Sequence, residues 1–332
     1  MSTKIKPSKG APYARILGVG GYRPVRVVPN EVILETIDSS DEWIRSRSGI
    51  ETRHWANDEE TVAAMSIEAS GKAIADAGIT AEQIGGVIVS TVSHFKQTPA
   101  VATEIADKLG TNKAAAFDIS AGCAGFGYGL TLAKGMVVEG SAEYVLVIGV
   151  ERLSDLTDLE DRATAFLFGD GAGAVVVGPA KEPMIGPTVW GSEGDKSETI
   201  KQTVPWTEYD STGKFPAITQ EGQAVFRWAV FEMAKVAQQA LDAAGITPDD
   251  LDVFIPHQAN ERIIDSMVKT LKLPEHVTVA RDVRTTGNTS AASIPLAMER
   301  LLATGEAKSG DTALVIGFGA GLVYAATVVT LP

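Results

Sequence analysis

Short apolar runs alternate with longer amphipathic segments along most of the chain. The runs are rich in β-branched residues and are bounded by glycine, proline or polar residues, a pattern typical of buried strands. We expect strands at 86–90, 144–148, 174–177, 253–255 and 312–316, and helices at 61–77, 99–109, 126–138, 222–243, 261–271 and 292–304. Strands that alternate with helices in this way indicate an α/β fold.

The two halves of the chain repeat this order. The apolar run 145–149 follows Cys123 at nearly the distance at which the run 313–317 follows Asn288, and the strand and helix at 86–109 correspond to those at 252–271. This self-similarity predicts an internal duplication. We place the boundary so that one half spans residues 1–184 and the other spans 185–332. The polar segment 191–220 is predicted to be an irregular insertion beside a ligand channel.

Length and charge exclude several classes of protein. A chain of 332 residues with 45% hydrophobic residues can fill two cores. No apolar run is long enough to span a membrane and no signal peptide precedes the first strand, so we expect a cytoplasmic protein that does not associate with membranes. The net charge of −13 argues against nucleic-acid binding. An anionic partner would therefore have to meet a local basic patch.

The only cysteine, Cys123, lies where an apolar run gives way to a helix of small residues. A thiol at a helix N-terminus experiences the positive end of the helix dipole, which favours the thiolate, and the unpaired N–H groups there can hold an oxyanion. A lone cysteine is more commonly a small buried hydrophobe. His257 and Asn288 lie at similar junctions, however, and such junctions meet on one side of an α/β sheet. The sequence therefore predicts a site built from Cys123, His257 and Asn288.

The segments around these residues also resemble known motifs. Gly-Cys-Ala-Gly-Phe at Cys123, Pro-His-Gln-Ala-Asn at His257 and Gly-Asn-Thr-Ser at Asn288 are similar to the three active-site motifs of the β-ketoacyl-acyl-carrier-protein synthase III family. The resemblance runs from about residue 14 to residue 329 and includes Ser39-Ser-Asp-Glu-Trp-Ile44, Phe168-Gly-Asp-Gly-Ala-Gly173 and Phe318-Gly-Ala-Gly321. It implies a five-layered thiolase fold of two βαβαβαββ halves, and a homodimer.

The resemblance implies an acyltransferase of fatty acid synthesis that condenses a short, straight or branched acyl-CoA primer with malonyl-acyl carrier protein. The residues support this chemistry. The Cys123 sulfur would attack the acyl thioester, and His257 (through Nε2–H) and Asn288 would stabilise the enolate formed as malonate loses CO2. Neither a metal ion nor a cofactor is needed, since acyl-CoA is a substrate.

Other readings remain open at this point. A priming ketosynthase of a polyketide pathway would use the same three residues. Thiolases need a second cysteine, and elongating ketosynthases need a second histidine where this chain has Asn288. A non-catalytic thiolase-fold partner would be expected to lack the nucleophile. A cysteine hydrolase would use His257 as a base toward water.

By the same resemblance, the N–H groups of Cys123 and Ala320 form the oxyanion hole, and Phe318 keeps water away from the malonyl carboxylate. Ala320 stands where the family commonly has glycine, so this assignment requires a negative φ. Thr98 stands where many relatives have a phenylalanine that reaches across the dimer to close the acyl pocket. The smaller side chain of Thr98 predicts a roomier pocket.

The resemblance also marks binding residues outside the pocket. Trp43 and Arg162 match the pair that stacks the adenine ring of CoA, and further CoA contacts match Ser39, Arg47, Gly222, Phe226 and Asn260. Arg262 and Lys269 are two helical turns apart and share one face, with Lys272 three residues further on. Together with Arg227 they form a predicted landing site for acyl carrier protein. Without the resemblance, a solvated charged face explains these four residues equally well.

Overall fold

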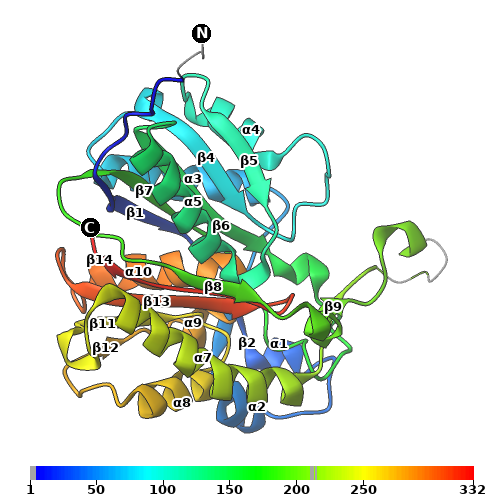
Figure 1. Cartoon of the computed structure of the whole chain (residues 1–332). Helices are drawn as coiled ribbons and strands as arrows, with labels where there is room; N and C mark the ends of the chain where they lie inside the picture. The colour runs from blue at the N-terminus through cyan, green and yellow to red at the C-terminus, as the bar shows by residue number, and fades with distance from the viewer. Residues whose placement is uncertain (1–4, 210–212, 214) are drawn as a thin grey trace.

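Two five-stranded sheets stacked with helices make up the computed structural model, which describes residues 5–209, 213 and 215–332 (Figure 1). The first sheet has the strand order β1-β7-β6-β4-β5, and the second has the equivalent order β8-β14-β13-β11-β12. In each sheet three adjacent strands are parallel, namely β5, β4 and β6 in the first and β12, β11 and β13 in the second. The next strand, β7 or β14, runs antiparallel to both of its neighbours. The predicted α/β class and the duplication are therefore confirmed.

Each half runs β-α-β-α-β-α-β-β along the chain. The first half consists of β1 (Tyr13–Tyr22), α3 (Val62–Asp76), β4 (Ile84–Ser90), α4 (Val101–Leu109), β5 (Ala115–Ile119), α5 (Gly125–Glu139), β6 (Tyr144–Arg152) and β7 (Asp170–Ala180). The second consists of β8 (Val189–Ser192), α7 (Gly222–Ala244), β11 (Val253–Pro256), α8 (Glu261–Leu271), β12 (Thr278–Val279), α10 (Ser293–Thr304), β13 (Thr312–Gly319) and β14 (Val323–Thr330).

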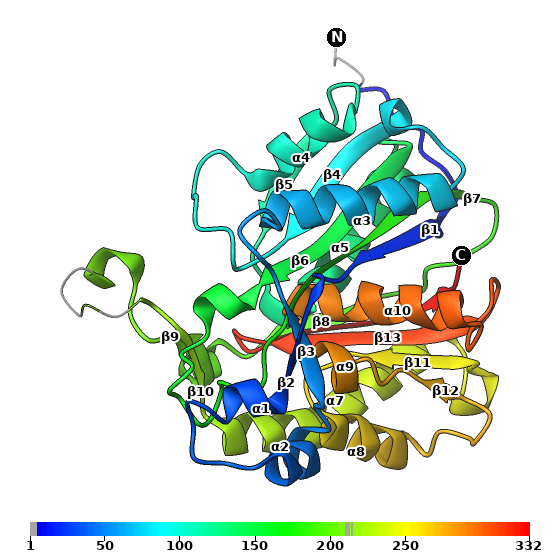
Figure 2. The same ribbon diagram turned by 180° about the vertical axis from the view of Figure 1, so that it is seen from behind.

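The five layers are visible when the molecule is seen from behind (Figure 2). Helices α3 and α4 cover the outer face of the first sheet, and α7 and α8 cover the outer face of the second. Helices α5 and α10 lie between the sheets, where Phe126, Leu130, Ile294 and Met298 join one core with strands of both. Because α5 follows Cys123 and α10 follows Asn288, the middle layer brings the two predicted site residues toward each other.

One segment of the first half lies against the second. It contains β2 (Arg26–Pro29), α1 (Asn30–Ile33), α2 (Asp41–Ser48) and β3 (Thr52–Trp55), of which α2 contacts α8 and β3 contacts α9 (Val283–Thr286). The fully buried Arg53 holds this segment in place by donating to the Val28 and Phe166 carbonyls at 3.2 and 2.9 Å and to Asn30 Oδ1 at 2.6 Å. The strands of the first large sheet end at residue 180 and those of the second begin at residue 189, yet this segment from the first part of the chain packs against the second half.

The insertion at 191–220 is not irregular throughout. Its strands β9 (Ile200–Gln202) and β10 (Ile218–Gln220) form an antiparallel hairpin, from which an arm extends away from the body (Figure 1). The strand pattern escaped prediction because each strand has only three residues. The insertion does border the ligand cavities, as predicted, because Ile200 and Ile218 line them. Within the described part of the chain, no helix combines the length and hydropathy needed to cross a membrane.

Candidate active site

Cys123 occupies a single 3-10 turn (Gly122–Ala124) between β5 and α5, the junction that the sequence predicted. Gly122 has φ of +47°, a conformation that favours glycine. The end of β13 passes directly beside the thiol, because a methyl group added to Gly319 would lie 2.8 Å from Cys123 Sγ. The nucleophile is thus held between the two halves of the molecule.

Cys123, His257 and Asn288 line one cavity of about 80 Å³. Phe318, Ala320 and Ser290 also face it, and its remaining walls are largely apolar. The three predicted residues come from separate junctions: after β5, after β11 and before α10. The structure therefore brings together the constellation that the sequence predicted.

The surroundings of the Cys123 thiol favour its protonated form. The cavity leaves part of the residue accessible, yet burial raises the pKa of the Cys123 thiol to about 12. The Ser290 hydroxyl and the Cys123 N–H lower this pKa, and the nearby carboxyl of Glu151 raises it further. Desolvation of the sulfur therefore outweighs the hydrogen bonds that favour the thiolate.

His257 is buried immediately after β11, with Nδ1 2.7 Å from Ser293 Oγ. The same hydroxyl oxygen accepts from the N–H of Gln258 at 3.4 Å, so the hydroxyl hydrogen is free to donate to Nδ1. The ring proton is then assigned to Nε2. Burial lowers the pKa of His257 to about 3, which keeps the ring neutral. His257 is thus suited to donate from Nε2 and poorly suited to accept a proton. The edge-to-face contact with Phe318, at 5.5 Å between ring centroids, fixes the ring plane.

Asn288 is oriented by its own loop. Its Oδ1 accepts the N–H of Ser290 at 2.9 Å, which leaves the Nδ2 hydrogens free of that interaction. Its backbone is held by the strip 167–169, with the Asn288 N–H donating to Leu167 O at 2.8 Å and the Gly169 N–H donating to Asn288 O at 3.0 Å. The side chain is nearly buried, at 8% exposure, and lines the cavity. Asn288 can therefore present an amide donor beside Cys123.

The backbone at Ala320 avoids the positive φ that would require a glycine, as the oxyanion-hole assignment demands. Among the described non-glycine residues, positive φ angles occur at Lys113, Lys272 and Ser290, so Ala320 does not need the freedom of glycine. A methyl group on Gly122 would lie 3.5 Å from the Ala320 amide nitrogen, so the two loops are in near contact. Both proposed oxyanion donors thus come from segments beside the sulfur.

A larger cavity of about 610 Å³ adjoins the first and shares Asn288, Gln220, Val225, Ala259 and Ile263 with it. Five of the predicted CoA-binding residues line it: Trp43, Arg47, Gly222, Phe226 and Asn260. The Arg162 guanidinium lies 5.1 Å from the centre of the Trp43 ring, so the two side chains are adjacent, although Arg162 does not line the cavity itself. Ser39 is also outside the lining, and its buried Oγ has no hydrogen-bond partner among the described residues.

The predicted basic residues divide into two groups. Arg227 and Arg262 line the large cavity, and the Arg262 guanidinium lies 4.9 Å over the Phe226 ring. Lys269 and Lys272 are exposed farther along α8, where Lys272 caps the helix C-terminus. The opposite face of α8 is buried, as the amphipathic pattern predicted, through Ile263, Ile264, Met267 and Leu271.

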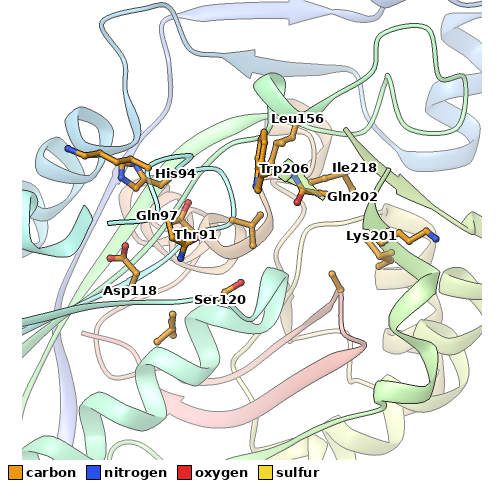
Figure 3. Close-up of a pocket in the computed structure, with 15 residues that line it drawn as sticks. Thr91, His94, Gln97, Asp118, Ser120, Leu156, Lys201, Gln202, Trp206 and Ile218 are labelled. Carbon is orange, nitrogen blue, oxygen red and sulfur yellow. The ribbon is translucent and has the colours of Figure 1, made fainter. Parts of the chain in front are cut away.

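A third cavity of about 450 Å³ lies beside the hairpin arm and is lined by Thr91, His94, Gln97, Asp118 and Trp206 among others (Figure 3). It shares Val92, Ile200, Ile218 and Ala320 with the cysteine cavity. Thr98 is exposed and lines neither of these cavities in its own chain. Its expected place in the acyl pocket of a dimer partner stays a prediction.

Sequence reasoning missed Ser290, Ser293 and Glu151. Ser290 ends the Asn288 motif and Ser293 follows three residues later, but nothing in the pattern indicated that Ser293 would hold His257 or that Ser290 would face the cysteine cavity. Glu151 follows a continuous apolar run in β6, and the predicted strand ended before it. Within the described residues, no cluster of His, Cys, Asp and Glu has the makings of a metal site.

Comparison with known proteins supports the same family. Residues 117–194 match the model described as 3-oxoacyl-[acyl-carrier-protein (ACP)] synthase III, and residues 241–331 match the model of its C-terminal part. The chain is 92% identical to a β-ketoacyl-[acyl-carrier-protein] synthase III of Streptomyces glaucescens, over 99% of this chain and 100% of that protein. It is 55% identical to the mycobacterial enzyme of that name from Mycobacterium marinum, over 99% of each.

Solved structures agree with these sequence matches. A priming β-ketosynthase from a polyketide biosynthetic pathway has a TM-score of 0.97 and 45% identity, over 100% of this chain and 99% of that one. The 3-oxoacyl-[acyl-carrier-protein] synthase III of Aquifex aeolicus has a TM-score of 0.88 and 37% identity, over 96% and 99%.

Proposed function

The chain belongs to the β-ketoacyl-acyl-carrier-protein synthase III family, and from this premise we propose how its pocket residues perform the family's condensation. The enzyme is an acyltransferase that joins an acyl-CoA primer to malonyl-acyl carrier protein with loss of CO2. The observation that carries the residue assignment is the convergence of Cys123, His257 and Asn288 on one small cavity. The product of this condensation is a β-ketoacyl-acyl carrier protein.

In the first step, Cys123 Sγ attacks the acyl-CoA carbonyl carbon and the CoA thiolate leaves. The developing oxyanion accepts from the N–H groups of Cys123 and Ala320, donors fixed beside the sulfur before the substrate arrives. The large cavity supports this step, because it leads from Trp43 and Arg47 to Asn288. The adenine ring would stack at Trp43 and Arg162, with pantetheine passing Phe226 and Asn260 toward the thiol.

In the second step, malonyl-acyl carrier protein occupies the channel that CoA has left. His257 Nε2–H and the Asn288 amide donate to the malonyl thioester carbonyl, so the electrons of the breaking C–CO2 bond are held as an enolate. The enolate carbon attacks the acyl group on Cys123, and the sulfur leaves as a thiolate. Phe318, packed edge-on against His257, keeps water from the reacting carboxylate.

We place this chemistry at the start of fatty acid synthesis, with a short, straight or branched acyl-CoA as primer. A polyketide priming role is the second candidate, favoured by the TM-score of 0.97 to a priming β-ketosynthase. Arg227 and Arg262 would receive the acidic carrier at the cavity, with Lys269 and Lys272 extending the contact along α8. We further propose a cytoplasmic homodimer in which Thr98 borders the partner's acyl pocket.

Mass spectrometry of the protein after incubation with acyl-CoA tests the assignment. Wild type should gain one acyl mass on Cys123, and Cys123→Ser should gain none, because a hydroxyl there has no neighbouring base strong enough to form an alkoxide. Acylation of the serine variant, or of another residue in wild type, would contradict the proposal. Acetyl-, isobutyryl- and isovaleryl-CoA, compared with one malonyl carrier, would define the primer.

A further inference from the structure

The cysteine cavity adjoins two larger cavities whose described linings have no residue in common. One is the cavity of about 610 Å³ in which CoA is proposed to bind, and the other is the cavity of about 450 Å³ beside the hairpin arm (Figure 3). Ala320 lines both the cysteine cavity and the cavity of 450 Å³. An acyl carbonyl held at the Ala320 N–H therefore lies at the boundary between these two, and the acyl chain can continue away from CoA.

Three further side chains, all apolar, form this boundary: Val92, Ile200 and Ile218. The two isoleucines belong to the hairpin of β9 and β10, which is a two-stranded sheet of its own. Val92 instead follows β4 of the first large sheet by two residues, and it packs against the buried cluster that contains Leu153. Val92 is therefore the side of the boundary that the body of the molecule carries.

Val92 is held in place by a carboxyl group for which the two-step mechanism has no use. Glu151 Oε2 accepts from the Val92 N–H at 3.1 Å. It also accepts from the hydroxyls of the two flanking residues, Thr91 at 3.2 Å and Ser93 at 2.7 Å. The Ser93 hydroxyl oxygen in turn accepts from the Arg152 N–H at 2.8 Å. One carboxyl oxygen thus fixes three consecutive residues, of which the outer two are buried and the middle one is half-buried at the cavities.

These hydrogen bonds begin where the strands of the sheet stop pairing. β4 and β6 are paired in parallel up to Ser90 and Gly149. Beyond that pair, the Glu151 side chain and the Ser93 hydroxyl connect the two chain segments. Displacing Val92 would separate buried donors from a buried acceptor, which is unfavourable because water cannot replace the lost partners there. The Val92 wall is therefore stiff.

We propose that Val92 sets the upper length of the acyl primer, and that Glu151 is the positioning residue that holds Val92 at the cavity boundary. This inference rests on the proposed function, because it concerns the acyl group carried by Cys123. A short or branched acyl group is accommodated against Val92 within the cysteine cavity. A longer straight chain has to displace Val92 before it reaches the cavity of 450 Å³.

The efficiency of acyl-enzyme formation with acetyl-, isobutyryl- and hexanoyl-CoA, followed by mass spectrometry of quenched time courses, tests the role of Val92. Val92→Ala should raise the ratio of hexanoyl to acetyl efficiency by about tenfold or more, because it removes two methyl groups from the boundary. Val89→Ala is the matched control. Val89 lies three residues earlier on β4, is fully buried and lines none of the three cavities, so this variant should keep the wild-type ratio.

The same ratio tests the role of Glu151. Glu151→Leu removes the acceptor and should raise the ratio, by about tenfold at most. Glu151→Gln should keep the wild-type ratio, because its amide oxygen can still accept the three hydrogen bonds. Combining Glu151→Leu with Val92→Ala should add little to Val92→Ala alone, since one residue acts through the other. If Glu151→Leu fails to fold, Ser93→Ala replaces it, because that change removes the bonds to Glu151 and to the Arg152 N–H.

Each part of the inference has a result that would overturn it. If Glu151→Leu slowed acylation by all three primers by one factor, or if its effect added fully to that of Val92→Ala, Glu151 would not position Val92. An unchanged ratio in Val92→Ala, an equal shift in Val89→Ala, or equal use of hexanoyl- and acetyl-CoA by wild type would overturn the assignment of Val92. Failure of every primer to acylate Cys123 in wild type would instead refute the proposed function.

Discussion

His257 Nδ1 lies 2.7 Å from Ser293 Oγ, so the imidazole of His257 is held in place by the first turn of α10. Asn288 belongs to the loop that leads into the same helix. The two donors proposed for the malonyl carbonyl are therefore positioned by one structural unit, although they are far apart in sequence.

Ser293→Ala should slow condensation by about tenfold, because His257 loses the partner that fixes its tautomer and ring orientation. This is less than the roughly 10²–10³-fold effect of removing an oxyanion donor outright. Single-turnover assays of acylation and condensation would check it. Ser293→Thr, which keeps a hydroxyl, is the control. A drop in acylation equal to the drop in condensation would contradict the assignment.

Asn288→Ala should leave acylation largely intact and slow decarboxylative condensation by about 10²–10³-fold, since its amide acts only on the malonyl carbonyl. Release of CO2 from malonyl carrier, followed separately from acyl transfer, measures the difference. Equal loss in both half-reactions would refute this division of labour.

Gly319→Ala should impair acylation by about 10²-fold, since the new methyl group would lie 2.8 Å from Cys123 Sγ and displace it from its attack position. Gly135→Ala on α5 is a matched control, because its methyl group would meet nothing within 4 Å. Thermal unfolding of both variants would separate a local displacement from loss of the fold. Normal acylation in Gly319→Ala would contradict this prediction, because it would mean that the end of β13 can move aside to make room for the methyl group.

Arg262→Glu should reduce kcat/KM for malonyl-acyl carrier protein more than for the acyl-CoA primer, because the carrier meets the whole basic face whereas the primer depends on the channel. The effect should shrink at high salt, as screening weakens steering. Lys181→Glu, which changes net charge equally outside the cavities around Cys123, is the control. The landing site would be excluded by equal losses for both substrates at both salt concentrations.

The buried, neutral His257 should make the fold less stable at acidic pH, because the unfolded chain binds a proton there that the folded chain does not. Its pKa falls from 6.5 to about 3 on burial, so the folded state binds fewer protons than the unfolded state between these values. Its contribution to the free energy of unfolding is present above pH 6.5 and is lost at about 1.4 kcal/mol per pH unit below it.

Glu151 and Asp170, whose pKa values burial raises to about 7 and about 6, act in the opposite direction over part of this range. The test is therefore the difference between wild type and His257→Gln in denaturant unfolding from pH 7 to 5. The stability of wild type should fall more steeply. Parallel curves would mean that His257 is not held neutral.

The sequence alone determined the α/β class, the long helices, the duplication and five of the strands in the two large sheets, and it singled out the candidate site residues. Each of the predicted helices ends within two residues of its expected bounds, because apolar periodicity and glycine C-caps are local properties. The positions of Cys123, His257 and Asn288 at equivalent junctions also followed from local pattern. Their convergence was predictable because strand ends meet at one edge of a sheet.

The tertiary structure decided what these residues are chemically. The thiol pKa of Cys123, the tautomer of His257 and the proximity of Glu151 depend on desolvation and on hydroxyls that the fold brings from other elements. The segment from β2 to β3 is held together by the buried Arg53, which donates to Val28, Asn30 and Phe166, whereas a sequence pattern gives Arg53 as an ordinary surface cation. Periodicity reports which face of an element is buried, whereas basicity and hydrogen-bond networks depend on distances between elements that no local pattern contains.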